Sequence, residues 1–307
     1  MATAFTNRVF GCVIIKSINS NYNADFTHQP RTLPDGTVYA TDKALKYSVR
    51  NYLKKAYPDE KVFYFKTFSS ELQPRTLDEN YEQYFGTYLK EKDAQLRRTV
   101  AKNLFECVDV RLFGGTYAGK TNLSIHGPLQ ITHGVNRFVE GIIYSEQIMS
   151  PFRNSGASSA DSTMSTLGTQ SKLKEGHYVH GLSLNPHNIS DLIELSGGQT
   201  LNTDDVAKAK KALTQGATLY DSAAKSGTEN ELMLWVQLKP GSMLVLPSFV
   251  ELISVDADRM IHLEKVTEIL ERPTVSEHIE KIELYYDSTA TQVTGQPTNA
   301  TVLEINQ

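Results

Sequence analysis

The stretch Gly114-Gly-Thr-Tyr-Ala-Gly119-Lys120-Thr121 matches the phosphate-loop pattern G-x-x-x-x-G-K-[ST] at every position. It follows an apolar run over residues 108–113 that is typical of a strand. A phosphate loop also requires a helix that begins at the lysine, because the amides and dipole of that helix hold the phosphates. This stretch therefore decides between a nucleotide-binding α/β fold and a different architecture.

The residues after Lys120 oppose such a helix. They read Thr-Asn-Leu-Ser-Ile-His, which alternates like a strand, and the pair Gly127-Pro128 follows. Proline interrupts helices and restricts the residue before it. Without the helix the amides are not aligned on a phosphate. The sequence therefore favours a flexible strand-to-strand loop that carries one lysine over a site for ATP or GTP.

The composition is that of an ordinary folded protein. Of 307 residues, 40% are apolar and 21% are charged. No apolar run reaches the roughly 18 residues of a membrane span, and the start MATAFTNR lacks the pattern of a secretory signal. We therefore expect a cytoplasmic protein with no membrane partner. Cys12 and Cys107 lie in apolar runs and are expected to be buried free thiols.

Charge is distributed unevenly along the chain. The formal net charge is −4, but residues 1–120 carry 18 Lys/Arg against 13 Asp/Glu, while the remainder carries 13 against 22. A basic face can therefore coexist with a nearly neutral total, and such polarity also suits self-association. The charge balance does not exclude a nucleic-acid partner.

The pattern of apolar residues, turn residues and proline predicts an α+β protein. Strands are expected over 8–18, 61–68, 108–113, 177–184, 231–238 and the end of 276–287, with a β-like pair within 122–149. Helices are expected over 42–56, 77–106 with a bend near Gly86, and 203–224. Residues 154–171 are small and polar and are expected to form a mobile loop, and residues 288–307 a flexible tail.

The order of the first elements is compatible with a ferredoxin-like sheet, the architecture of RNA-recognition modules. We therefore expect one domain over residues 1–307, with insertions at about 60–107 and about 150–176. The aromatic motifs that ordinary recognition modules place on the sheet are missing, so base stacking on the sheet is not expected.

The helix expected over 42–56 carries four cations on one side. At about 100° per residue, Lys43, Lys46, Arg50 and Lys54 fall within one narrow arc. No acid lies between Asp42 and Asp59, so the helix supplies no i,i+4 partners within that range. The arc predicts a grip on a polyanion such as a nucleic-acid backbone. The alternative is a solvated lysine-rich face.

The sequence gives no comparable signal for catalysis or metal binding. His126 and His133 lack supporting ligands, and His177 and His180 fall on opposite faces of a strand. No paired carboxylates or nucleophile motif stand out. We expect no cofactor, no metal site and no enzymatic activity.

Three groups of segments stand out together: residues 38–53, residues 109–115 followed by 127–134, and residues 163–168 followed by 176–181. In this order they resemble the backbone subunits of CRISPR Cascade complexes, the Cas-seven superfamily, in its type I-B branch. The resemblance covers roughly residues 8–290.

This resemblance implies a hand-shaped subunit with a modified RNA-recognition palm and inserted finger and thumb segments. Copies would stack head to tail along one CRISPR RNA, hold its backbone, displace a base at regular intervals and display the guide for pairing with target DNA. Partners would be the guide RNA, further copies and other Cascade subunits. The implied RNA-binding residues are Lys43, Lys46, Arg50, Lys54, Arg111, Gly114, Gly115, Lys120, Gln130, His133, Thr166, Gly168, Lys172 and Lys174.

A rival function also follows from the resemblance. Type III relatives cleave RNA with an aspartate in the loop after the first strand, and Asp25 lies in that loop here. An aspartate in a polar loop commonly forms a turn instead. The alternative function is thus a metal-dependent endoribonuclease that uses Asp25.

Overall fold

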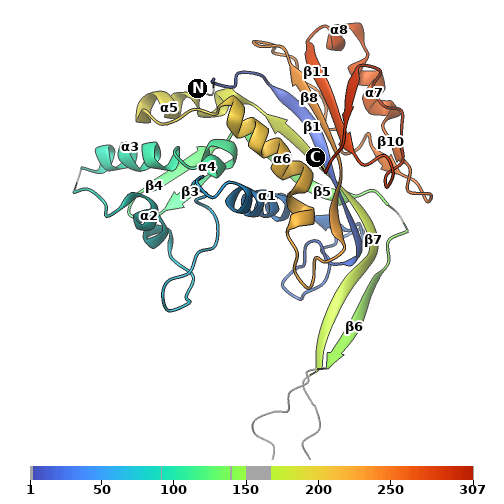
Figure 1. Ribbon diagram of the computed structural model, residues 1–307, viewed down its shortest axis with the longest axis horizontal. Coiled ribbons are helices and arrows are strands. Elements are labelled where there is room, and N and C mark those ends of the chain that lie inside the picture. The colour runs from blue at the N-terminus through green and yellow to red at the C-terminus, as the bar shows by residue number, and fades with distance from the viewer. Residues whose placement is uncertain (1–2, 91, 139, 150–166, 307) are drawn as a thin grey trace, which may run out of the picture.

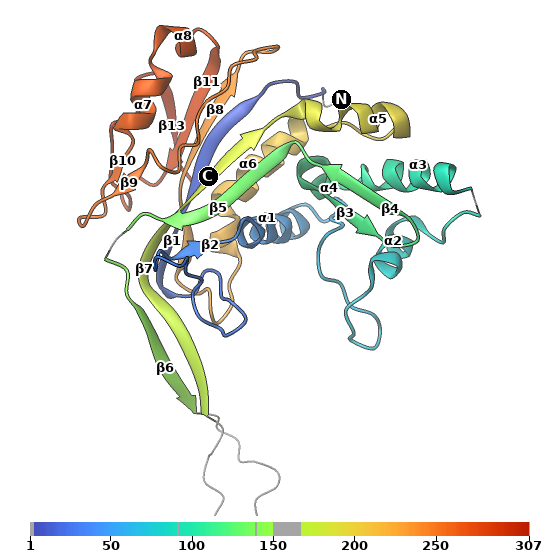
Figure 2. The same ribbon diagram turned by 180° about the vertical axis from the view of Figure 1, so that it is seen from behind.

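The computed structural model describes residues 3–306 except 91, 139 and 150–166. Its centre is a twisted sheet with the strand order β13-β11-β8-β1-β7-β5-β2, and β6 pairs with an extension of β7 (Figures 1 and 2). The mixed α+β class expected from the sequence is what the structure shows.

Four antiparallel strands and two helices form the middle of the molecule. In chain order they are β1 (Val9–Ser20), α1 (Asp42–Ala56), β5 (Leu129–Asn136), β7 (Leu167–Leu184), α6 (Thr203–Leu219) and β8 (Thr228–Leu238). Along the chain these elements follow the order strand-helix-strand-strand-helix-strand, and in the sheet β1 lies between β7 and β8.

Both faces of this sheet are covered. Helices α1 and α6 pack on one face, where Val13 and Trp235 belong to the larger apolar core. The segment 246–275 covers the other face, where Ile14 and Leu234 belong to a second core. Because successive strand residues point to opposite faces, β1 and β8 read as continuous apolar runs.

The edges of the sheet are short strands. β2 (Tyr39–Ala40) pairs with β5 at one edge. At the other, β11 (Ile279–Tyr286) pairs with β13 (Ala300–Leu303) in parallel. A small sheet of β9 (Ser254–Val255), β10 (Ile261–His262) and β12 (Val293–Thr294) lies nearby with α7 (Glu264–Leu270) and α8 (Pro273–Ser276).

The structure differs from the flexible tail expected over 288–307. This region contains β12 and β13, both paired with neighbouring strands, and the side chains of Thr291 and Ile305 are buried. Edge strands as short as these are held by backbone hydrogen bonds to a neighbouring strand. The polar side chains around them therefore do not reveal them in the sequence. The described part of this region is an ordered edge of the protein.

A smaller body is inserted between α1 and β5. It contains α2 (Leu77–Phe85), α3 (Asp93–Leu104), α4 (Val108–Phe113), β3 (Gly114–Ala118) and β4 (Asn122–His126). The 3₁₀ helix η1 (Pro186–Ile189) and helix α5 (Ser190–Ser196) pack against this inserted body. The expected bend near Gly86 is a helix end, since α2 stops there at a φ of 78°.

Two strand predictions in this body are wrong. Residues 108–113 form helix α4, and all six are buried. Residues 61–68 form no strand, because the N–H groups of Phe63 and Tyr64 donate to the carboxylate of Asp109 rather than to a neighbouring strand. A short apolar run without periodicity does not distinguish a buried strand from a buried helix.

A long β-hairpin projects from the sheet (Figures 1 and 2). It consists of β6 (Ile143–Met149) and the first part of β7, in register from Ile143 opposite Leu173 to Met149 opposite Leu167. The prediction of a loop over 154–171 is therefore wrong for residues 167–171, which belong to strand β7. The rest of that prediction, 154–166, lies outside the described residues.

Candidate nucleic-acid interface

Helix α1 forms as predicted, and its apolar side faces the core while its cations face outward. Leu45, Val49 and Leu53 are fully buried, whereas Lys43 and Lys54 are exposed. Thr41 stands at the N-cap, but its hydroxyl donates to Asn23 rather than capping the helix.

The two middle cations of the arc have partners within the protein, which the sequence did not predict. Arg50 Nε lies 2.9 Å from the fully buried carboxylate of Asp109, and its guanidinium lies over the ring of Phe113. Lys46 Nζ lies 3.0 Å from Asp42. Burial alone would raise the pKa of Asp42, but Lys46, Lys43 and His133 lower it below its ordinary value. Arg50 ties α1 to the inserted body.

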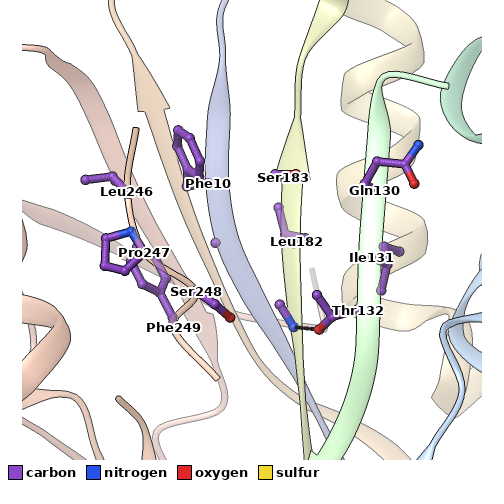
Figure 3. Close-up of a pocket in the computed structure, with 12 residues that line it drawn as sticks. Phe10, Gln130, Ile131, Thr132, Leu182, Ser183, Leu246, Pro247, Ser248 and Phe249 are labelled. Atoms are coloured by element: carbon purple, nitrogen blue, oxygen red, sulfur yellow. Dashed lines mark hydrogen bonds between the residues drawn. The ribbon is translucent and has the colours of Figure 1, made fainter. Parts of the chain in front are cut away.

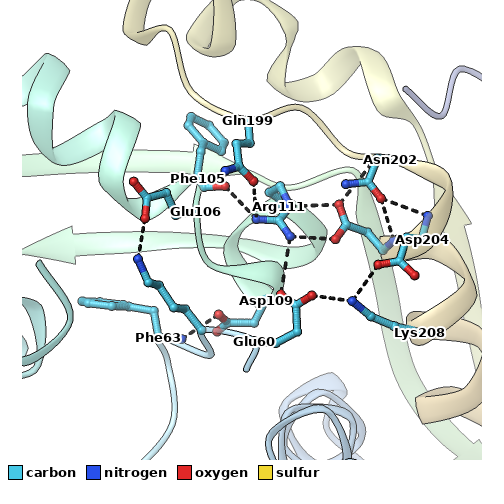
Figure 4. Close-up of polar contacts among 12 residues, drawn as sticks. Glu60, Phe63, Phe105, Glu106, Asp109, Arg111, Gln199, Asn202, Asp204 and Lys208 are labelled. Atoms are coloured by element: carbon cyan, nitrogen blue, oxygen red, sulfur yellow. Dashed lines mark hydrogen bonds and ion pairs between the residues drawn. The ribbon is translucent and has the colours of Figure 1, made fainter. Parts of the chain in front are cut away.

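The burial of Arg111 contradicts its predicted role as an RNA contact (Figure 4). Its guanidinium forms a two-pronged ion pair with Asp205, at 2.8 and 2.7 Å, and donates to the carbonyl of Phe105 at 2.9 Å. Glu60 lies 3.8 Å away. The side chain is 4% exposed, so it joins α4 to α6 and does not reach a ligand.

The glycine-rich stretch is a β-hairpin. Gly114 follows α4 at a φ of 64°, and a Cβ there would meet Ile125 O at 2.0 Å. Gly119 and Lys120 lie between β3 and β4, so no helix follows the lysine. The Lys120 N–H donates to the carboxylate of Asp78 at 3.0 Å. The backbone amide of Lys120 is thus already bound by a carboxylate. The connection from strand to strand that the sequence favours over a helix is what the structure shows. Gly115 lies at the other end of β3, opposite Ile125 of β4.

The predicted residues of β5 point to different places. His133 is 55% exposed and lies beside the start of α1, with Nδ1 3.7 Å from Asp42 Oδ1. Gln130 lies on the opposite face of the sheet, where it lines a cavity of about 240 Å³ together with residues 246–249 (Figure 3). A register irregularity between Ile131 and Gly134 separates the two. The structure brings His133, but not Gln130, to the cationic side of α1.

The predicted residues near the projecting hairpin are also separate from α1. Gly168 pairs with Ile148 on the hairpin. Lys172 lies 3.0 Å from Glu146 of the opposite strand, and Lys174 is exposed. Thr166 lies outside the described residues. Two lysines therefore stand on the hairpin itself, apart from the group around Lys43.

Asp25 forms its own turn. Its Oδ1 accepts the N–H groups of Thr27 at 2.8 Å and Gln29 at 3.0 Å, and the hydroxyl of Thr27 at 2.8 Å. The hydrogen bond from the Thr27 side chain, with these amides, lowers the pKa of Asp25. This is the turn-forming arrangement rather than a free metal ligand.

His177 and His180 are both buried, on opposite faces of β7. His177 Nδ1 lies 2.6 Å from Glu231. His180 Nδ1 donates to the carbonyl of Thr132 at 3.0 Å, and burial lowers the pKa of His180 to about 4. Among the described residues, no group of three or more His, Cys, Asp or Glu side chains could hold a metal ion.

Sequence reasoning missed an aromatic group beside the cations of α1. Tyr47 stacks on Phe65 with ring centroids 5.0 Å apart, and its other neighbour is Tyr220 at 5.2 Å. Lys54 Nζ lies 5.0 Å from the centre of the Phe65 ring. The run Phe63-Tyr64-Phe65, followed by Lys66, is visible in the sequence, but its apolar pattern predicts a strand and not a surface beside α1.

The exposed cations Lys43 and Lys54 thus lie on the outward side of α1, and Lys54 lies against the half-buried ring of Phe65 that stacks on Tyr47. The sequence matches the family model described as CRISPR-associated protein Cas7 over residues 7–271. The chain therefore belongs to that family.

Solved structures with a similar fold come from "CRISPR RNA-guided surveillance complex, pre-nicking" and "CRISPR RNA-guided surveillance complex". The first has a TM-score of 0.55 at 12% identity over 97% of this chain and 96% of that chain. The second has a TM-score of 0.47 at 12% identity over 94% of each. A comparison with curated protein sequences gave no match. In the described part of the chain, every helix is too short or too polar to cross a bilayer.

Proposed function

We propose that this chain is a non-catalytic backbone subunit of a type I CRISPR effector complex, of the type I-B branch, that polymerises along the guide RNA. Membership of the Cas7 family over residues 7–271 carries the proposal. The similar structure comes from a CRISPR RNA-guided surveillance complex, which supports RNA as the partner.

Each part of the structure has a role in this proposal. The central unit β1-α1-β5-β7-α6-β8 serves as the RNA-recognition-like palm. The body with α2, α3 and α4 serves as the finger, and the hairpin of β6 and β7 as the base of the thumb. Bound RNA then pairs with target DNA, while other copies and other Cascade subunits complete the complex.

The outward side of α1 is the part of the palm that contacts the guide backbone. Lys43 and Lys54 are eleven residues apart, which corresponds to roughly 16 Å along a helix. Both are exposed, whereas Lys46 and Arg50 are held by Asp42 and Asp109. Lys43 and Lys54 can therefore bind phosphates without breaking an ion pair that holds the fold together. His133 and Lys120 are further polar groups on exposed positions.

The test is a titration of labelled single-stranded RNA with the double variant Lys43→Glu and Lys54→Glu over a series of salt concentrations. We expect binding at low salt to fall by about tenfold or more. The slope of log affinity against log salt should also shrink by about 0.7 for each lost phosphate contact on a single strand. The matched control is Lys265→Glu, an exposed lysine on α7. Equal affinity and slope for the double variant and the wild type would refute this placement.

A further inference from the structure

Within the inserted body, a cavity of about 240 Å³ lies between the segment that precedes α2 and the start of α2. Residues 63–67 form one wall, and residues 75–77 with Asn80 form the other. The lining includes three aromatic rings and the cations Lys66 and Arg75, and it includes no carboxylate. By contrast, a cavity beside α7 is lined by Asp256 and Glu264.

The aromatic wall is fixed before any ligand arrives. Asp109 accepts the N–H groups of Phe63 at 2.7 Å and Tyr64 at 2.9 Å. Asn80 donates to the carbonyl of Phe63 at 2.8 Å, and Thr67 donates to Asn80 at 2.9 Å. Hydrogen bonds at both ends hold the segment without a strand partner. A preformed wall reduces the entropy lost on binding.

The same wall borders the cationic side of α1. Lys54 Nζ lies 5.0 Å from the centre of the Phe65 ring, and the guanidinium of Arg50 lies 5.9 Å from that of Tyr64. Phe65 also stacks on Tyr47, with an angle of 24° between the two rings. Since Lys54 is exposed, it can move from the ring to a phosphate and leave a face of Phe65 open.

We infer that this cavity holds one unstacked nucleobase of a single-stranded RNA, with Phe65 as the stacking surface and Lys54 on the adjoining phosphate. Every base offers a face that stacks on an aromatic ring, and a nucleotide brings the negative charge that the acid-free lining accepts. The volume is below the about 300–1,000 Å³ of pockets for drug-sized ligands, which suits a single base. This inference rests on the proposed function and names a contact to bases that the phosphate contacts do not provide.

The test compares two probes: an oligoadenylate that carries one 2-aminopurine, and an abasic oligonucleotide of the same length and charge. The variant is Phe65→Leu, which keeps an apolar side chain beside Tyr47 but removes the ring face. The control is Phe26→Leu, because Phe26 is 97% exposed and also lies under a cation, Arg31, but in another loop. The rescue variant is Phe65→Tyr, which keeps an aromatic ring.

We expect Phe65→Leu to weaken binding of the oligoadenylate by about 5- to 100-fold and to remove the change in 2-aminopurine fluorescence that binding to the wild type produces. Binding of the abasic probe should change by less than about twofold, and Phe65→Tyr should restore both signals. Phe26→Leu should behave as the wild type does.

Two results would overturn the inference while the proposed function stands. One is salt-dependent binding of the oligoadenylate that Phe65→Leu leaves unchanged. The other is an equal loss for the abasic probe, which would assign the effect of Phe65 to folding or to the phosphates. If the wild type bound neither probe at low salt, the proposed function would fail together with the inference.

Discussion

Replacement of Arg111 by alanine tests the structural role that the buried ion pair assigns to this residue. The substitution leaves the carboxylate of Asp205, 1% exposed, without its bidentate partner, and it removes the bond to Phe105 O. Removing one partner of a buried ion pair costs about 3–5 kcal/mol, a large share of the about 5–15 kcal/mol by which domains are stable. We expect a loss of that size in the free energy of unfolding.

The assay is urea denaturation followed by fluorescence, combined with RNA titration at urea concentrations where the variant is still folded. Arg111→Lys, which keeps the charge but not the fork geometry, should lose less stability than Arg111→Ala. Lys102→Ala, at an exposed position on α3, should change stability by no more than about 0.5 kcal/mol. A folded Arg111→Ala protein of wild-type stability that binds RNA weakly would refute the reasoning and return Arg111 to the RNA-binding residues.

Three further predictions follow. Gly114→Ala should destabilise the protein by about 1–3 kcal/mol or more in thermal unfolding. A side chain at a φ of 64° is strained, and its Cβ would meet Ile125 O at 2.0 Å. An unchanged melting temperature would contradict this prediction. His180 has a pKa of about 4 in the folded protein and about 6.5 when unfolded, so the unfolded chain binds more protons between these values. Stability should therefore fall by about 2 kcal/mol from pH 7 to pH 5, and His180→Gln should flatten that slope; an equally steep slope in the variant would assign it to other groups. Asp25→Ala should leave complementary RNA uncut, as in the wild type, when the assembled complex is incubated with a divalent metal; cuts that only the wild type makes would instead support the endoribonuclease.

The elements that the sequence predicts well are those with a clear period or a clear terminator. β1 and α1 form where the apolar pattern placed them, with α1 ending at Ala56 before Pro58. The absence of a helix after Lys120 was also predictable, because the alternating residues and Gly127-Pro128 act locally.

The failures concern interactions between residues distant in sequence. The apolar run 108–113 has no period, so only its packing decides that it is a helix. The partners of Arg50 and Arg111 are Asp109 and Asp205, which lie 59 and 94 residues away. A helical wheel showed four aligned cations but not that one of them is neutralised by a distant carboxylate. The aromatic group beside α1 was missed for the same reason, because Phe65 reaches Tyr47 only in the folded protein.

The most direct measurement of the central claim is the mass of complexes that the purified protein forms with single-stranded RNAs of increasing length, determined by sedimentation at low salt. If copies line up along one RNA and hold its backbone through exposed cations such as Lys43, the number of protein chains per RNA should rise in steps with RNA length and fall as salt is added. A protein that stays monomeric with every RNA in dilute buffer would contradict the account.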